Sequence, residues 1–367
     1  MFILGKIRSF LQKKDIIFSG KRYGIDAMGA MAQGLFCTLL VGTILNTLGS
    51  QFNIGFLNAI IVTIGKGEGA VHYTIGGMAS ALVGPGIAVA IGFALKAPAL
   101  VLFSLIPVGF ATNAMGGAGG PLAVYVVAIV ACEFGKLVSK ETKIDILVTP
   151  IVTILVGIGL ASLIAAPIGA AASAVGNAVM WATNLQPFLM GILVSVIIGI
   201  ALTLPISSAA ICAALGLTGL AGGAAVAGCC AQMVGFAVMS FRENRWGGLV
   251  AQGVGTSMLQ MPNIIKNPRI WIPPTLASAI TGPIATCLFK LEMNGSPVSS
   301  GMGTCGFVGQ IGVYTGWVND PSKVITAMDW IGLVLICFVL PAVLSWAFCL
   351  VLRKWGWIKE NDLKLEL

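Results

Sequence analysis

The charged side chains of this sequence are too few to coat a soluble protein of its length. Of its 367 residues, 9% are Asp, Glu, Lys or Arg, whereas soluble domains average about 25%. Hydrophobic residues make up 57% of the chain, and its mean hydropathy is +0.97. These values exclude a soluble enzyme of the cytosol or the secreted space. They predict an all-α protein that crosses a membrane many times.

Apolar runs long enough for a membrane helix, about 20 residues, recur along the chain. The clearest are residues 27–48, 70–95, 122–138, 144–166, 188–204, 221–239, 270–289 and 330–352. Glycine-interrupted segments at 247–263 and 301–317 predict re-entrant pieces, because irregular backbone at membrane depth is tolerated where protein buries it. We expect eight to ten spans. The predicted domains are an amphipathic cytoplasmic segment (1–26), a transmembrane carrier domain (27–352) and a cytoplasmic tail (353–367).

Basic residues gather at the two ends of the chain. Ten of the 21 Lys and Arg residues lie before Tyr23 or after Leu352. Basic residues beside spans stay cytoplasmic, so we expect both termini inside a bacterial plasma membrane rather than a nucleic-acid-binding surface. The N-terminal stretch alternates apolar and charged residues. It is predicted to lie on the inner membrane surface and not to be a cleavable signal peptide.

The contents of glycine, cysteine and histidine indicate which kind of membrane protein this is. Glycine supplies 48 of the 367 residues, about 13% against an average near 7%. So high a share is typical of transporters with broken helices. The nine cysteines lie mostly in apolar runs without a C-x-x-C pair, so they are interpreted as packing residues. One histidine cannot build a His-rich metal cage. No metal and no cofactor is expected.

Two stretches of the sequence resemble each other. MASALVGP at 78–85 matches LASAITGP at 276–283 in five of eight positions, and Ala32-Gln33 recurs as Ala231-Gln232. Internal repeats are frequent in transporters, so we expect a partial repeat. The alternative is chance, because Ala-Ser-Ala and Gly-Pro are common in this sequence.

One region of the chain resembles a known family. DILVTPIVTILVG at 145–157, the pair Ala166-Pro167 and LPISSAA at 204–210 resemble enzyme IIC membrane subunits of the sugar phosphotransferase system, especially fructose-type ones. The whole pattern is most similar to the stand-alone, perfringolysin regulator-like branch. This resemblance implies a carrier fold, a sugar-like solute, alternating access, a homodimer, and separate IIA and IIB proteins as further partners.

Two departures limit what the resemblance implies. Fructose-type subunits carry Gly-x-x-Glu-Gly-Ala late in the chain, whereas that spelling occurs here at 65–70, and the later segment 261–266 lacks the glutamate. The sequence also contains no IIB domain with a phosphorylatable cysteine and no IIA domain. This chain by itself is therefore not expected to be an enzyme, and is at most a transport component.

Polar residues beside the predicted helix breaks are candidate solute ligands. Glu68 and His72 are four apart, would share a helix face, and suit sugar hydroxyls. The alternative is a surface loop in which Lys66 pairs with Glu68. Asn113 precedes a glycine-rich run whose backbone groups could meet a solute, or which could form only a tight turn.

Further candidates lie in the second half. Ser207 and Ser208 could bind a solute or cap a helix. Gln260 and Asn263, like the other amides Gln232, Gln252 and Gln310, could contact a solute or bond between helices. Glu133 is interpreted as a charge of a cytoplasmic loop over 133–145 or of a helix end. The expected site is a polar cavity near mid-membrane, walled by the re-entrant regions.

The leading hypothesis is a transporter of a small polar solute such as a sugar. The alternative is a membrane-embedded sensor that binds the solute without moving it. A membrane enzyme is disfavoured because the spans hold no paired carboxylates, and a channel because no acidic ring motif is present. Uptake into proteoliposomes separates transport from sensing.

Overall fold

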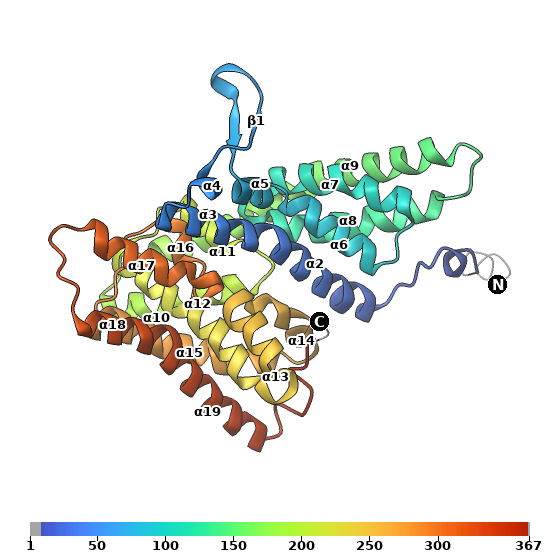
Figure 1. Ribbon diagram of the computed structural model, residues 1–367. Coiled ribbons are helices and arrows are strands. Elements are labelled where there is room, and N and C mark those ends of the chain that lie inside the picture. The colour runs from blue at the N-terminus through green and yellow to red at the C-terminus, as the bar shows by residue number, and fades with distance from the viewer. Residues whose placement is uncertain (1–8, 366–367) are drawn as a thin grey trace. The chain divides into compact units, whose positions relative to one another are not determined.

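The computed structural model describes residues 9–365, apart from the side chain of Glu68, and is almost wholly helical (Figure 1). Within this part of the chain, five helical runs are long and apolar enough to cross a membrane, or six if a bent pair counts as one span. They are Arg22–Phe52, Ala99–Val138, Asp145–Thr183, Gly219–Met239 and Ala327–Lys354. The all-α, multi-span prediction is confirmed. The number of eight to ten spans stays a prediction.

The helices group into two compact units. The first holds the chain up to Leu39 together with Ala81–Ala171, and the second holds Leu40–Ser80 together with Ala172–Leu367. The helices of the first unit are α2 (Ala27–Leu35), α6 (Val83–Ala94), α7 (Ala99–Gly116), α8 (Gly120–Val138) and the first part of α9 (Asp145–Thr183).

The run Ala99–Val138 is a helical hairpin. Gly117 has φ +51° at the turn between α7 and α8. A straight helix would hold Val101 and Gly135 about 50 Å apart, yet a Cβ at Gly135 would lie 2.8 Å from a Val101 methyl carbon. The run therefore contains two antiparallel helices, each long enough to cross a membrane.

Glycine sets the close packing of the first unit. α6 packs against α2, α7 and α8. Gly84 of α6 and Gly109 of α7 approach backbone to backbone, and a Cβ on either would collide with the other's carbonyl oxygen. Small residues allow such approaches between membrane helices, so a larger side chain at either position would force α6 and α7 apart.

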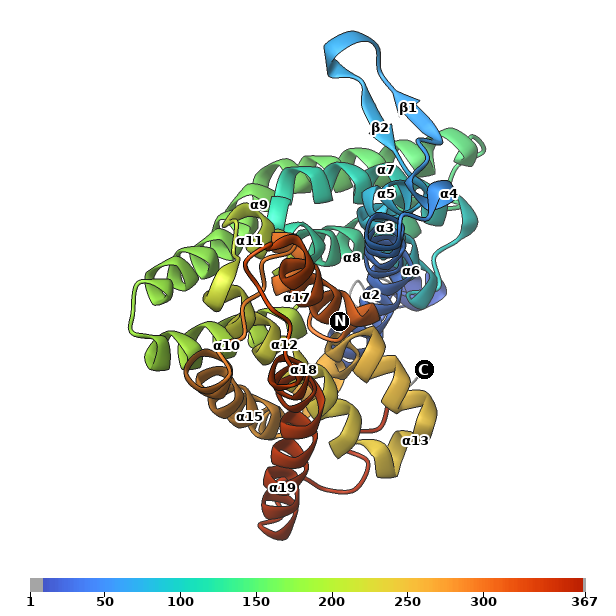
Figure 2. The same ribbon diagram turned by 60° about the vertical axis from the view of Figure 1, so that its left-hand side comes forward.

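The second unit is built around α12 (Gly219–Met239), most of which is buried. α12 packs against α10 (Pro187–Thr203), α15 (Ile272–Pro283) and α19 (Leu340–Lys354) (Figure 2). The other helices of this unit, besides the end of α9, are α3 (Val41–Phe52), α4 (Gly55–Asn58), α5 (Ile75–Ala81), α11 (Ser208–Ala214), α13 (Phe241–Val250), α14 (Met261–Lys266), α16 (Pro297–Ser300), α17 (Val308–Asn319) and α18 (Ala327–Val334).

The two segments predicted to be re-entrant are broken in the structure. Between α13 and α14 the chain passes through single π and 3₁₀ turns. Between α16 and α17 it turns at Gly303 and Gly306, both with positive φ. Both segments pack against α12, where protein buries their irregular backbone, as membrane depth requires.

A short hairpin replaces the start of the predicted span at 70–95. β1 (Val62–Ile64) pairs antiparallel with β2 (Val71–Tyr73), and Thr63 lies opposite His72. β-branched residues favour the extended strands, and Gly65 and Gly67 take positive φ in the loop. Helix begins only at Ile75, and a break at Leu82 separates α5 from α6.

Three predicted boundaries are wrong because helices run further than the polar residues indicated. The loop predicted over 133–145 begins only after Val138, where α8 ends. α7 continues through Asn113 to Gly116. α9 runs unbroken through Pro167 to Thr183, well past the end of the span predicted over 144–166. In α8 the partners of Glu133 and Lys136 come from the N-terminal segment, which lets both charges lie inside a helix.

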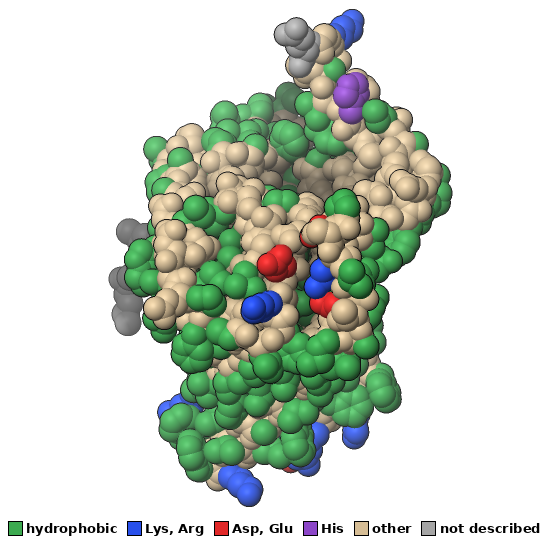
Figure 3. Space-filling model, turned by 90° about the vertical axis from the view of Figure 1, so that its left-hand side faces the viewer, with side chains coloured by type: hydrophobic (Ala, Val, Ile, Leu, Met, Phe, Trp, Pro, Cys, Tyr) green, Lys and Arg blue, Asp and Glu red, His purple; other side chains and the backbone are tan. Residues whose placement is uncertain are grey.

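Hydrophobic side chains cover much of the outer surface. Trp330, Ile331, Val343 and Trp346 of α18 and α19 are all exposed. Figure 3 shows a broad apolar band on one face, with Lys and Arg side chains at its lower end. Exposed apolar surface of this extent is typical of protein that faces lipid.

Candidate functional site

The structure brings two of the seven predicted ligands into direct contact. The side-chain N–H of Asn263 donates to Gln260 Oε1 at 2.8 Å. Ser207, Ser208 and the hairpin residues lie on other elements of the second unit, and Asn113 belongs to the first unit. We therefore describe the site from Gln260 and Asn263 outward.

His72 and Glu68 do not share a helix face. His72 is an exposed residue of β2, where its Nδ1 lies 2.9 Å from the Thr63 hydroxyl. Glu68 belongs to the single turn Gly67–Gly69, and its side chain lies outside the described part of the structure. The helical spacing argument is wrong because this stretch is a strand and a glycine turn. A role in solute binding stays a prediction.

Asn113 lies within α7 rather than in a loop. Its side chain is half-buried, and a Cβ on Gly120 would lie 2.7 Å from its carbonyl oxygen. The tight turn of the alternative interpretation exists, but it begins at Gly117, four residues later than expected. The missing side chain of Gly120 lets α8 start directly beside the end of α7.

Ser207 and Ser208 have structural partners. The Ala210 amide donates to Ser207 Oγ at 3.2 Å, so Ser207 is the N-cap of α11. The Ser208 hydroxyl donates to the Gly301 carbonyl at 2.8 Å, which fixes α11 against the turn after α16. The capping alternative is confirmed for Ser207, and contact of either serine with a solute stays a prediction.

A chain of buried amides continues from Gln260. Its Nε2 donates to Gln252 Oε1 at 2.8 Å, and Gln252 Nε2 donates in turn to Ser240 Oγ at 2.9 Å. Gln252 and Gln260 are fully buried, and Asn263 is 4% exposed. The broken segment between α13 and α14 is therefore held together by side-chain amides, where an unbroken helix would use its backbone.

A second polar group adjoins this chain. Gln232 of α12 accepts from Trp271 Nε1 at 2.9 Å and from the Thr203 hydroxyl at 3.3 Å. Its Nε2 donates to the Thr275 hydroxyl at 3.3 Å. Thr203 also lies 2.8 Å from Ser257 Oγ, on the same turn as Gln260. The interhelical alternative for Gln232 is confirmed, and we call both groups together the amide network.

The amide network contains no ionisable side chain. Its members are Thr203, Gln232, Ser240, Gln252, Ser257, Gln260, Asn263, Trp271 and Thr275. Amides and hydroxyls both donate and accept hydrogen bonds, whereas a buried charge needs an opposite charge to offset its desolvation. The network is chemically suited to a neutral, hydroxyl-rich ligand and unsuited to a charged one.

Sequence reasoning missed Ser240, Ser257 and all three partners of Gln232. These partners are Thr203, Trp271 and Thr275. Each lies in an apolar run, where Thr and Trp are ordinary residues, and none stands beside a charge. Only the fold brings them to Gln232, which is 29 to 43 positions away in the sequence. An unexplained amide in the middle of a span was the available signal.

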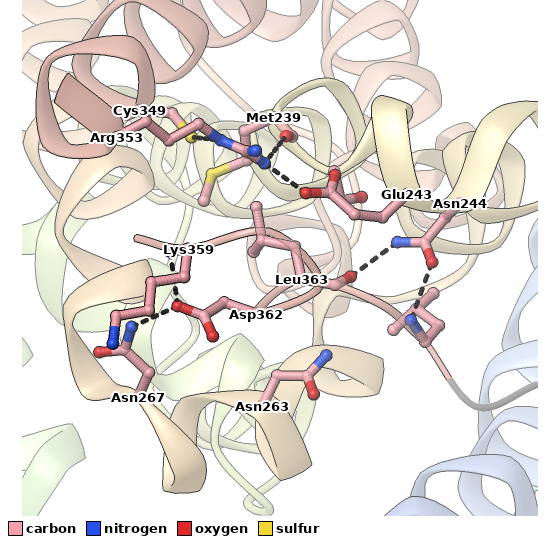
Figure 4. Close-up of polar contacts among 12 residues, drawn as sticks. Met239, Glu243, Asn244, Asn263, Asn267, Cys349, Arg353, Lys359, Asp362 and Leu363 are labelled. Carbon is pink, nitrogen blue, oxygen red and sulfur yellow. Dashed lines mark hydrogen bonds and ion pairs between the residues drawn. The ribbon is translucent and has the colours of Figure 1, made fainter. Parts of the chain in front are cut away.

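An ion pair lies near the amide network. Arg353 of α19 donates to Glu243 Oε1 at 2.6 Å, while Glu243 Oε2 is buried without a hydrogen-bond partner (Figure 4). A cavity of about 210 Å³ beside Arg353 is lined mainly by apolar side chains, among them Phe241, Leu249 and Trp346. Its lining does not fit a hydroxyl-rich solute, so the candidate site remains the amide network. Among the described residues, no three metal-ligating side chains group together.

Comparisons with known proteins agree with this architecture. A family described as phosphotransferase system, EIIC, matches residues 25–365, which is nearly the whole chain. No curated protein and no solved structure matches the chain.

Proposed function

The chain belongs to the phosphotransferase system EIIC family, and from this premise we propose that it moves a neutral, sugar-like solute across a bacterial plasma membrane by alternating access. The family match confirms the resemblance to enzyme IIC and makes the protein a membrane transport component. The fructose-type and regulator-like assignments remain proposals. EIIC proteins are transport components rather than phosphotransfer domains.

One observation carries the choice of solute class. The buried polar side chains around the broken segment after α13 form a network of amides, hydroxyls and one indole, without a charge. Hydrogen bonds to sugar hydroxyls can replace those between Gln260 and its neighbours at little net cost, because amides exchange similar partners. A charged substrate would leave its charge unpaired in the same place.

Further parts of the proposal follow the family. We include in it both termini on the cytoplasmic side, a homodimer, and separate IIA and IIB proteins as partners. The 1–26, 27–352 and 353–367 division is kept as the proposed domain organisation. Residues 1–8 of the predicted surface segment lie outside the described residues.

Transport is tested with the full-length protein in proteoliposomes. The probes are radiolabelled neutral hexoses and disaccharides, each paired with its phosphorylated form. We expect uptake of at least one neutral sugar, and at least tenfold weaker binding of its phosphate ester. Saturable binding without uptake would favour the sensor alternative, and preferential binding of phosphate esters would contradict the proposed solute class.

A further inference from the structure

The C-terminal segment folds back onto the second unit after α19. Gly356 and Asn361 both have positive φ and mark two reversals of the chain. The segment from Trp357 to Leu365 then lies against four amide side chains: Asn244, Gln260, Asn263 and Asn267. We call these four residues the amide groove and residues 357–365 the tail.

The groove binds the main chain of the tail. Leu363 carbonyl oxygen accepts from Asn244 Nδ2 at 2.7 Å and from Gln260 Nε2 at 3.0 Å. The Lys364 carbonyl accepts from Asn263 Nδ2 at 2.9 Å. The Leu365 amide donates to Asn244 Oδ1 at 2.8 Å (Figure 4). Asn244 thus bonds the tail as a neighbouring strand would, with one donor and one acceptor.

Asn267 holds the preceding turn of the tail. Its Nδ2 donates to Asp362 Oδ2 at 2.8 Å and to the Trp357 carbonyl at 2.9 Å. The same Asp362 oxygen accepts from the Lys359 amide at 2.8 Å. The Asp362 carboxylate therefore shapes the tail as well as anchoring it to the groove.

Two apolar side chains of the tail are buried against the protein. Leu363 is fully buried and Ile358 is 2% exposed, whereas Lys359, Glu360, Asn361 and Lys364 are exposed. Burial removes the apolar surface of Leu363 from water, which favours the docked tail. The tail is thus recognised through its backbone and a leucine, in the manner of an extended peptide bound in a groove.

The tail binds two residues that the proposed function assigns to solute binding. Gln260 and Asn263 belong both to the amide groove and to the amide network. Between the tail and these two residues, every hydrogen bond runs from a side-chain amide to a backbone carbonyl, a type of bond that a sugar hydroxyl can also accept.

We propose that the amide groove is a peptide-binding site whose occupant is the chain's own C-terminal segment, held as a displaceable strap. The second part of this inference rests on the proposed function: Gln260 and Asn263 can bind solute only when the strap has left. Because the tail is tethered, its effective concentration at the groove is on the order of millimolar, so a free peptide competes poorly until the tail is weakened.

The groove is tested directly with a fluorescent peptide of residues 355–367 added to the full-length protein in detergent. Leu363→Asp places a charge where the buried leucine sits and should release the tail. The matched control is Asn361→Asp, which adds the same charge at an exposed position whose left-handed backbone Asp also tolerates. We expect the peptide to bind the Leu363→Asp protein at least tenfold more tightly than the wild type or the control.

Equal peptide binding by all three proteins, or no binding by Leu363→Asp, overturns the groove assignment. Hydrogen exchange in the wild type gives a second test that needs no variant. The Lys359 and Leu365 amides should be protected, and a large excess of unlabelled peptide should speed their exchange. Protection that the peptide leaves unchanged would contradict a displaceable strap.

The strap's effect on solute is measured with the neutral sugar that binds best to wild-type protein. Leu363→Asp should raise its affinity severalfold, and Asn361→Asp should not. An unchanged affinity, with the tail shown to be released, overturns the gating part alone. If no sugar binds either protein, the proposed function fails while the peptide measurements still decide the groove.

Discussion

Each compact unit buries a polar cluster, and these two clusters differ in charge. The first unit buries a charged pair in addition to several hydroxyl groups: Lys136 of α8 lies 3.1 Å from Glu133, and its Nζ donates to the Asp15 carbonyl at 2.7 Å. In the second unit the buried groups are mainly neutral amides and hydroxyls. A buried charge is tied to its partner by a large desolvation cost, whereas an amide can exchange one hydrogen-bond partner for another.

This difference assigns the two clusters different roles. Glu133 also accepts from the Tyr23 hydroxyl at 3.0 Å, and Arg22 donates to the Leu95 carbonyl at 2.7 Å. The charges of the first unit thus fasten its N-terminal segment to α6 and α8. The neutral network of the second unit can exchange its hydrogen-bond partners, as the proposed solute site requires.

The largest effect is expected from breaking the charged cluster. Lys136 is 2% exposed and Glu133 is 7% exposed. Lys136→Met therefore leaves the buried Glu133 carboxylate without its positive partner. Removing one member of a buried ion pair costs about 3–5 kcal/mol. Chemical denaturation in detergent should show this loss, and the matched control Lys143→Met, at an exposed position, should stay within about 0.5 kcal/mol. A loss below 1 kcal/mol would mean that the cluster does not stabilise the unit.

A smaller loss is expected from the neutral network. Gln232→Leu removes the acceptor of Trp271 Nε1 and of the Thr203 hydroxyl. Unsatisfied buried groups of this kind cost about 1–3 kcal/mol. Denaturation should place this variant between Lys136→Met and wild type. A loss equal to that of Lys136→Met would contradict the distinction between the two clusters.

The surface ion pair of the N-terminal segment should contribute less still. Arg22 donates to Asp15 at 2.6 Å, and this hydrogen bond lowers the pKa of the Asp15 carboxyl below its ordinary value of 3.8. A lowered carboxyl pKa stabilises the fold above pH 3.8, and that contribution is lost as the pH falls through the folded value. We expect Asp15→Asn to cost under about 1 kcal/mol at pH 7 and to flatten the pH dependence of unfolding below pH 4. If the stability of Asp15→Asn falls with pH below pH 4 as steeply as that of wild type, the Arg22–Asp15 pair does not stabilise the fold.

The smallest effect is expected at the hairpin. His72 is exposed, so His72→Ala should change the free energy of unfolding by less than about 0.5 kcal/mol. Thermal unfolding in detergent checks this. Loss of sugar binding in the same variant would bring the hairpin into the site, as the sequence predicts, and would weaken the case for the amide network.

The all-α, multi-span class could be predicted because a membrane helix is a local feature of the sequence, a run of apolar residues. Glu133 and Lys136 could not be placed, because two charges at the end of such a run look like a loop until tertiary partners bury them. The hairpin was missed because three-residue strands around glycines carry little pattern. Gln260 and Asn263 stood out as amides in apolar sequence, but their tail partners are about 100 residues away along the chain.

The central claim is that Gln260 and Asn263 bind the solute. Its most direct measurement is the equilibrium affinity of the best neutral sugar for Gln260→Leu and Asn263→Leu, each made in the tail-released Leu363→Asp protein. The control in the same background is Gln33→Leu, which makes the same change at an exposed position. Each lost hydrogen bond of about 1–1.5 kcal/mol predicts a five- to tenfold weaker affinity for the first two variants. The control should bind like Leu363→Asp alone. Unchanged affinity in both network variants, with folding intact, would contradict the account.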